Sequence, residues 1–150
     1  MDSPLIFFRE VTFEDLKPLI ELGFGDDPEL MSKYQQLPTE FEETVQRNVD
    51  NIREMSEHLP LSYYKVLWGE EVIGFTVLEF ANSILYSFGI NIKFRKKEVV
   101  TEWIEKVEQL FKGSFQCVLW DKNERAINFL IRNGMKPFKR DGKNTFLIKY

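Results

Sequence analysis

The amino-acid sequence predicts an α+β fold, in which a mixed, mostly antiparallel twisted sheet of about seven strands is flanked by about four helices. Apolar residues recur at strand spacing in seven segments and at helical spacing in four. A strand–helix–strand crossover around residues 97–112 implies one parallel or splayed strand pair within the sheet. No repeat, low-complexity tract or Gly/Ser/Pro-rich linker divides the chain, so we expect a single domain over residues 1–150.

From the N-terminus, the apolar run at residues 5–8 predicts a short buried strand. Residues 12–23 predict a helix that is short or begins late, because Thr12 and the acidic residue three positions on form a helix start while a proline follows inside. A glycine at the end of this segment is the expected stop. Residues 23–38 have no clear period and contain several breakers, which indicates a loop. A capping-box pattern and apolar residues at helical spacing then predict a helix over residues 39–59.

The middle of the chain changes to strand spacing. Residues 63–68 and 72–80 predict a hairpin around a Gly-Glu turn, and residues 84–92 predict a third strand antiparallel to its neighbour. Residues 97–112 form the strongest amphipathic helix in the chain, which a glycine ends.

The last third of the chain returns to strands around one more helix. Residues 115–120 predict an apolar strand. Residues 123–133 predict a helix opened by an asparagine cap and ended by an Asn-Gly pair. Residues 135–140 and 144–150 predict a closing hairpin on an Asp-Gly turn.

Composition excludes several classes of protein. The single cysteine leaves no disulfide within the chain, and one His with one Cys cannot make a zinc set, so we expect no metal. The apolar runs are far shorter than a membrane span, the start of the chain does not resemble a leader, and a cytoplasmic location is the simplest interpretation. The chain is acidic and its aromatic residues fall at core periodicities, which argues against nucleic acid.

The formal net charge of −4 is unevenly distributed. Residues 1–60 carry a net charge of −9 and the rest carry +5. One part would favour a cationic ligand and the other a phosphorylated one. Alternatively, both are ordinary solvated faces.

Basic residues precede the strongest helix. Arg95, Lys96 and Lys97 lie where unpaired N–H groups and the positive end of the helix dipole converge, which makes an anion site. The alternative is an ordinary solvated turn.

Two sequence motifs and the element order carry a resemblance to a known family. Residues 90–95, Ile-Asn-Ile-Lys-Phe-Arg, enter a helix, and residues 123–126, Asn-Glu-Arg-Ala, are followed by Asn-Gly-Met at residues 133–135. The chain thereby resembles the GNAT superfamily of N-acetyltransferases as a divergent member, over nearly its whole length and most closely over residues 62–150. The resemblance implies a GNAT-type sheet that holds acetyl-coenzyme A between the strand ending near Ile92 and the strand ending near Trp120.

The resemblance also implies a set of coenzyme contacts. They are Ile90, Ile92, Arg95, Lys96, Lys97, Glu98, Val99, Val100, Asn123 and Phe129. The family pattern has small residues where this chain has Glu98 and Val100, and glycine there lets the backbone approach phosphate. Either Glu98 turns outward and the coenzyme binds, which we favour, or its carboxylate displaces the pyrophosphate. Asn123 has the alternative role of a plain helix cap.

The same resemblance suggests catalytic groups. Glu79 is the candidate general base, and the alternative is an exposed strand residue or a surface ion pair. The family's tyrosine on the last helix is replaced by Leu130, with Phe129 beside it, so Tyr86 or a water is the candidate proton donor to the thiolate. Backbone N–H groups from Gly89 to Ile92 would hold the oxyanion, with the glycine permitting a bulge.

The expected function is acetyl-coenzyme A-dependent N-acyl transfer by direct attack of an amine on the thioester. The acidic residues between 23 and 43 and the following helix would suit a cationic acceptor. The expected partners are an amine-bearing small molecule or peptide, and a second copy of the chain in a homodimer. The alternative is a catalytically silent GNAT-fold binding or interaction module, which the loss of the small residues would explain.

Overall fold

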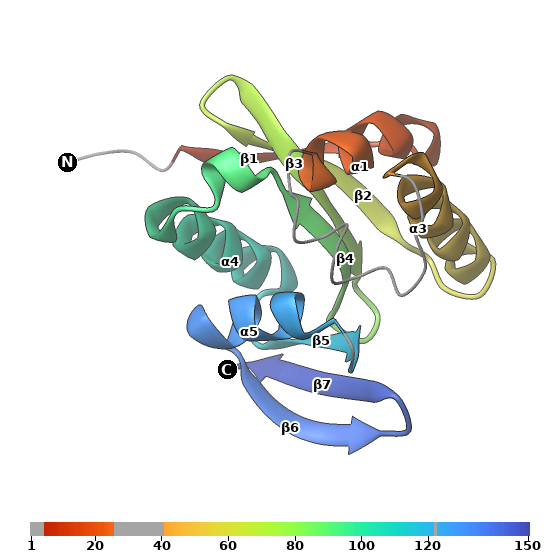
Figure 1. Ribbon diagram of the computed structural model, residues 1–150. Helices are drawn as coiled ribbons and strands as arrows, with labels where there is room; N and C mark the ends of the chain where they lie inside the picture. The colour runs from red at the N-terminus through yellow and green to blue at the C-terminus, as the bar shows by residue number, and fades with distance from the viewer. Residues whose placement is uncertain (1–4, 26–40, 122) are drawn as a thin grey trace.

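The computed structural model describes residues 5–25, 41–121 and 123–150. Within them, seven strands form one sheet in the order β1-β2-β3-β4-β5-β7-β6 (Figure 1). The strands are β1 (Ile6–Val11), β2 (Ser62–Trp68), β3 (Glu71–Glu79), β4 (Ile84–Ile90), β5 (Phe115–Trp120), β6 (Lys136–Asp141) and β7 (Asn144–Lys149). The helices are α1 (Leu16–Phe24), α3 (Phe41–Ser56), α4 (Lys97–Phe111) and α5 (Glu124–Arg132), with short 3₁₀ turns η1 (Phe13–Asp15) and η2 (Ile92–Phe94). The predicted fold class is thus confirmed.

The sheet is antiparallel except where β4 meets β5. This parallel ladder contains two residue pairs, Ile84 with Gln116 and Leu85 with Cys117. The neighbouring ladders of β3 with β4 and of β5 with β7 contain six each. Beyond Leu85 the two strands therefore diverge, as the crossover around α4 predicts.

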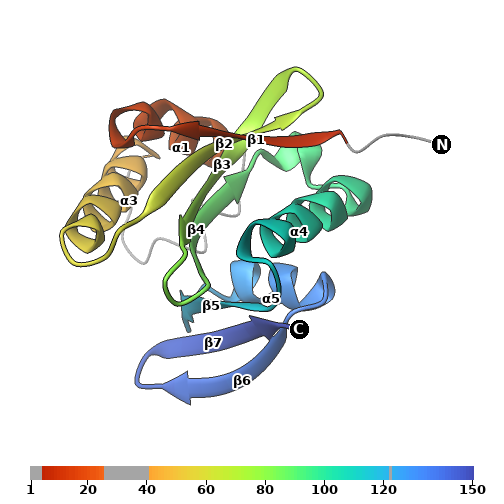
Figure 2. The ribbon, with the colours of Figure 1, turned by 180° about the vertical axis from the view of Figure 1, so that it is seen from behind.

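Two apolar clusters lie on opposite faces of the sheet. Helices α1 and α3 cover one face and α4 and α5 the other (Figures 1 and 2). The α1–α3 cluster is built on Phe75 and Val77 of β3. On the other face, fully buried Trp103 of α4 donates its indole N–H to Thr76 Oγ1 at 3.0 Å. Each face of β3 thus anchors one helical layer.

Some element boundaries differ from the sequence-based expectation. Strand β1 lies at an edge of the sheet and leaves Phe7 49% exposed, so residues 5–8 are not a buried strand. Helix α1 begins only at Leu16, which places Pro18 in its first turn, where a missing N–H is tolerated. Gly23 lies inside this helix and packs on the backbone of Gly89, rather than ending the helix.

The segment expected as a loop at residues 23–38 and the capping box expected at residues 39–42 fall mostly outside the described residues. None of the helices in the described part is long and apolar enough to cross a membrane.

Candidate functional site

A cleft of about 1140 Å³ opens where β4 and β5 diverge. Its floor is formed by residues 86–90 of β4 and by Val118 and Leu119 of β5. Residues of α3 form one wall, and residues of α5 with η2 form the other. The short parallel ladder is therefore what creates the site.

The backbone of β4 presents polar groups to this cleft. The N–H of Asn91 donates to the carbonyl of Ile73 at 2.8 Å, so the facing pair Gly74–Ile90 is of the non-hydrogen-bonded kind. Successive strand residues alternate in direction, and Phe88 and Ile90 therefore turn their N–H and C=O groups away from β3 and toward the cleft. Of the amides expected between Gly89 and Ile92, that of Ile90 faces the site, whereas that of Asn91 is bonded to β3.

A bulge in β4 brings two further side chains to the floor. Val77 pairs with Ser87 and Leu78 pairs with Leu85, which leaves Tyr86 as the extra residue. Both Tyr86 and Ser87 line the cleft. The bulge thus lies at Tyr86 rather than at Gly89, where the sequence suggested it.

Tyr86 is half-buried, and its phenol has a raised pKa. Desolvation is the main cause, and the negative charge of Glu54 on α3 adds to it. Both effects favour the protonated phenol. Tyr86 therefore offers the cleft an O–H donor over the neutral pH range.

Arg95 makes two hydrogen bonds to backbone carbonyls at the mouth of the cleft. Its Nε donates to the carbonyl of Ile90 at 2.6 Å, and its Nη2 donates to the carbonyl of Gly23 at 3.4 Å. Beside it, Asn91 Nδ2 donates to the carbonyl of Leu22 at 2.8 Å. These bonds join the end of α1 to the end of β4. No sequence pattern indicated the bonds to Gly23 and Leu22, because their partners are about 70 residues apart in the chain.

The N-terminus of α4 comes directly after Arg95 in the chain. Lys96 is its N-cap and makes no side-chain cap, and Lys97 and Glu98 are exposed. Val99 and Val100 are 2% and 1% exposed and belong to the core, so their side chains do not occupy the helix mouth. Of the sequence-selected residues, Ile90, Ile92, Arg95, Asn123 and Phe129 line the cleft together with Tyr86, and the residues from 96 to 100 do not.

Helix α5 contributes a cap and an aromatic side chain. Asn123 Oδ1 accepts the N–H of Ala126 at 3.4 Å, so the cap predicted from the sequence is present. Phe129 stacks on Phe88 with ring centroids 6.3 Å apart, whereas Leu130 is fully buried. The cleft-facing position on this turn is therefore Phe129 and not Leu130.

The structure places Glu79 elsewhere. Its side chain is 1% exposed, and its carboxylate accepts the N–H groups of Ala81 at 3.0 Å and of Asn82 at 2.9 Å. It therefore caps the turn between β3 and β4 and does not line the cleft. The alternatives of an exposed strand residue or a surface ion pair are therefore wrong for Glu79, while its role as a general base stays a prediction.

Three of the four charged residues that line the cleft lie on α5. The four are Arg95, Glu124, Arg125 and Arg132. The α3 wall instead presents Thr44, Asn48, Asn51 and Ile52. The α3 residues that line the cleft are thus uncharged, whereas the acidic residues expected between 23 and 43 fall mostly outside the described residues, so the acidic acceptor side stays a prediction.

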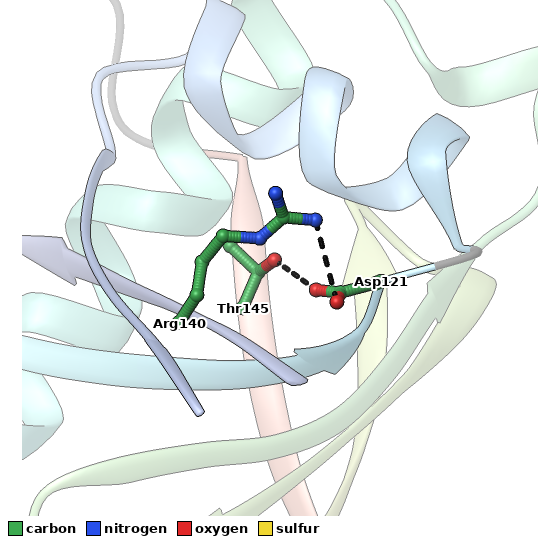
Figure 3. Close-up of polar contacts among 3 residues, drawn as sticks. All are labelled: Asp121, Arg140 and Thr145. Carbon is green, nitrogen blue, oxygen red and sulfur yellow. Dashed lines mark hydrogen bonds and ion pairs between the residues drawn. The ribbon is translucent and has the colours of Figure 1, made fainter. Parts of the chain in front are cut away.

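A polar cluster fixes the end of β5, where the chain turns toward α5 (Figure 3). Asp121 Oδ1 accepts a hydrogen bond from Thr145 Oγ1, and Arg140 Nη2 lies 3.3 Å from Asp121 Oδ2. The N–H of Asp121 also donates to the carbonyl of Lys143 at 2.7 Å. The β6–β7 hairpin therefore holds the segment that precedes the Asn123 cap.

Other reactive groups do not reach the cleft. Cys117 is buried in the core, and burial raises the pKa of its thiol to about 12. Within the described residues, no three His, Cys, Asp or Glu side chains lie together as a metal site would require.

Comparisons with solved structures identify similar folds. An acetyltransferase from Thermus thermophilus is 18% identical with a TM-score of 0.71, and each chain is covered to 99%. The PaiA N-acetyltransferase from Thermoplasma acidophilum, solved with coenzyme A, is 21% identical with a TM-score of 0.61, covering 96% of this chain and 98% of that one. The N-acetyltransferase PseH from Campylobacter jejuni, solved with acetyl coenzyme A, is 13% identical with a TM-score of 0.51, covering 95% and 97%. The sequence matches no protein-family model and no curated protein.

Proposed function

We propose that this chain, which has the fold of the GNAT acetyltransferases, is an N-acyltransferase that moves an acetyl group from acetyl-coenzyme A to the amine of a small molecule or peptide. The observation that carries the proposal is the parallel ladder of β4 and β5, which stops after two pairs. It leaves a strand edge facing a cleft that is large enough for an extended ligand.

The residues around the cleft fit the chemistry of coenzyme A. An extended amide-containing arm would pair with the backbone of Phe88 and Ile90 as an added strand does. The uncapped N-terminus of α4, with Arg125 and Arg132 across the cleft, would attract the pyrophosphate. Exposed Glu98 and buried Val100 leave the mouth of the helix open, which supports the outward-turned arrangement of Glu98.

When bound, acetyl-coenzyme A supplies the acetyl group as a thioester, a form that is open to attack by an uncharged amine. One of the two cleft-facing amides, that of Phe88 or that of Ile90, would donate to the carbonyl oxygen as negative charge develops there, and the other would pair with the extended arm, because the two N–H groups lie about 6.6 Å apart along the strand. The amine nitrogen forms a bond to the carbonyl carbon while the carbon–sulfur bond breaks. Tyr86 donates its phenolic proton to the departing thiolate and is reprotonated by solvent, which also takes the proton lost by the nitrogen.

Thermal unfolding with and without acetyl-coenzyme A tests the proposal. Ligand at 100 times its dissociation constant stabilises the folded state by about 2.7 kcal/mol, which raises the melting temperature by several degrees. Arg132→Ala should reduce this shift, because Arg132 lines the cleft, whereas Glu98→Ala should leave it nearly unchanged, because Glu98 does not. No shift at millimolar ligand would contradict coenzyme binding. A shift without acetyl transfer to any amine would contradict the enzymatic step alone.

A further inference from the structure

We infer, on the basis of the proposed function, that the acceptor is a small amine of low pKa with hydroxyl or carbonyl groups beside it, and that Asn48 and Asn51 bind those groups. The inference starts from the wall of the cleft formed by α3, which we call the amide wall and define as Thr44, Asn48 and Asn51. These three residues recur at the spacing i, i+4, i+7, which places them on one face of the helix.

The amide wall is the uncharged face of a strongly charged helix. The charged residues of α3 are all exposed and lie outside the cleft lining; they are Glu42, Glu43, Arg47, Asp50, Arg53 and Glu54. Across the floor, the bulge of β4 adds Tyr86 and Ser87, which are also uncharged hydrogen-bonding residues. Four neutral polar side chains from two elements, Asn48, Asn51, Tyr86 and Ser87, therefore line the cleft beside buried Thr44.

Carboxamides and hydroxyls recognise groups like themselves. Asn48 Nδ2 already donates one hydrogen bond to the carbonyl of Thr44 at 2.9 Å, so its Oδ1 and second N–H, together with the carboxamide of Asn51, are what can pair with a hydroxyl or a carbonyl. A carboxamide does not neutralise an ammonium ion, whose transfer out of water is costly without an opposite charge. Glu54 is the carboxylate whose charge reaches Tyr86, but its side chain is exposed and does not line the cleft. The described wall thus favours a neutral polar acceptor over a polyamine.

The lining also limits how the amine loses its proton. Among the described residues, the one carboxylate that lines the cleft is Glu124, on α5. An acceptor at the amide wall would then give its proton to water, and its own pKa decides how much of it is reactive. An amine with a pKa near 7.8 has about 260 times more uncharged form at pH 7.5 than one with a pKa near 10.4.

A panel of three acceptors tests this inference. Glucosamine carries hydroxyls beside its amine, glycinamide carries a carbonyl, and cadaverine carries only methylenes and a second cation. With acetyl-coenzyme A at pH 7.5, we expect kcat/KM for glucosamine or glycinamide to exceed that for cadaverine by roughly 100-fold. The rise of kcat/KM with pH should follow the amine pKa of each acceptor. Whichever of glucosamine and glycinamide has the higher kcat/KM then shows whether the site recognises hydroxyls or a carbonyl.

Two variants separate the role of the amide wall from a general effect of charge. Asn51→Asp adds a carboxylate to the wall with little change in shape, and Gln46→Glu adds one to an exposed position of the same helix outside the cleft. We expect Asn51→Asp to lower kcat/KM for the preferred acceptor about tenfold and to raise it for cadaverine. Gln46→Glu should change neither. Equal effects of the two variants would overturn the role of the wall.

Preference for cadaverine, or acetyl-coenzyme A binding with no transfer to glucosamine or glycinamide, would overturn the acceptor class while leaving the coenzyme site intact. A protein that does not bind acetyl-coenzyme A would overturn the proposed function instead. In that event, binding of glucosamine, glycinamide and cadaverine without coenzyme, measured by saturation-transfer NMR, still decides the acceptor class. Stronger binding of cadaverine overturns it.

Discussion

The backbones of Gly74 and Gly89 touch across β3 and β4. A Cβ atom on Gly74 would lie 1.9 Å from the carbonyl oxygen of Gly89, which is closer than real contacts allow. Gly23 of α1 packs on the same carbonyl, where a Cβ would lie 2.9 Å from it. This contact holds α1 against β4 directly beside the cleft.

Gly74→Ala should therefore destabilise the protein strongly. The clash is with backbone rather than with the end of a flexible side chain, so we expect a loss of about 3 kcal/mol in the free energy of unfolding. Gly142→Ala is the matched control, because a Cβ atom there would meet nothing within 4 Å. The only loss in its free energy of unfolding comes from placing alanine at a φ of 62°, which costs about 1 kcal/mol. Denaturant unfolding of both variants measures the difference, and equal losses would contradict the close contact.

Tyr86→Phe should lower turnover while leaving the affinity for acetyl-coenzyme A unchanged. Removal of a positioned proton donor costs roughly 100-fold in kcat. Tyr64→Phe serves as the control, since burial also raises the pKa of Tyr64 but this residue does not line the cleft.

The pH dependence follows from the raised pKa of Tyr86. The donor is the protonated phenol, so its contribution persists through pH 10.0, the ordinary pKa of tyrosine, and is lost as the pH rises through the higher folded-state value. A Tyr86→Phe variant with wild-type kcat would exclude this role.

Phe129→Tyr should increase turnover. The ring of Phe129 lines the cleft beside Phe88, so a hydroxyl added to it would supply a second donor near the reacting atoms, and we expect a gain of about tenfold in kcat. Leu130→Tyr should instead cost about 1–3 kcal/mol of stability through overpacking, because Leu130 is fully buried. Steady-state kinetics and thermal unfolding on both variants distinguish the two positions. A gain in turnover for Leu130→Tyr would show that the assignment is reversed.

Cys117 should make the protein less stable at alkaline pH. Burial raises its pKa from 9.0 to about 12, so between these values the unfolded thiol has lost its proton and the folded one has not. The unfolded state then binds fewer protons, and the free energy of unfolding falls with pH by about 1.4 kcal/mol per unit from this group. Below pH 9 the contribution is fully present. Denaturant unfolding of wild type and Cys117→Ala across pH 8–11 should give diverging slopes, and parallel curves would refute the shift.

The order of elements was predictable because each strand and helix carries its own apolar period. Helix α4 illustrates this, since Val99, Trp103 and Val107 recur at helical spacing and are all buried. The end of β4 was not predictable in the same way. Asn91 Oδ1 accepts the N–H of Lys93 at 3.0 Å and starts a 3₁₀ turn, which ends the strand at Ile90 rather than at residue 92. Apolar residues continue to alternate through Asn91, so the sequence pattern does not reveal the hydrogen bond that the Asn91 side chain makes.

The candidate site was predictable only in part. Asn123, Ile90 and Phe129 were selected from motifs and do line the cleft. Glu79 was placed by analogy, and its true partners are the amides of a turn only two and three residues away. The uncharged residues of α3 belong to no motif and do not alter the net charge, so neither signal points to them. Their spacing at 44, 48 and 51 was nevertheless readable as one face of a helix.

With two residue pairs, the β4–β5 ladder is the shortest ladder in the sheet. Beyond Leu85 the ladder pairs no further residues of the two strands. A ligand that spans both strand edges replaces the missing rungs. Such a ligand would add a second link between the two parts of the sheet, which already share one apolar core on the α4–α5 face.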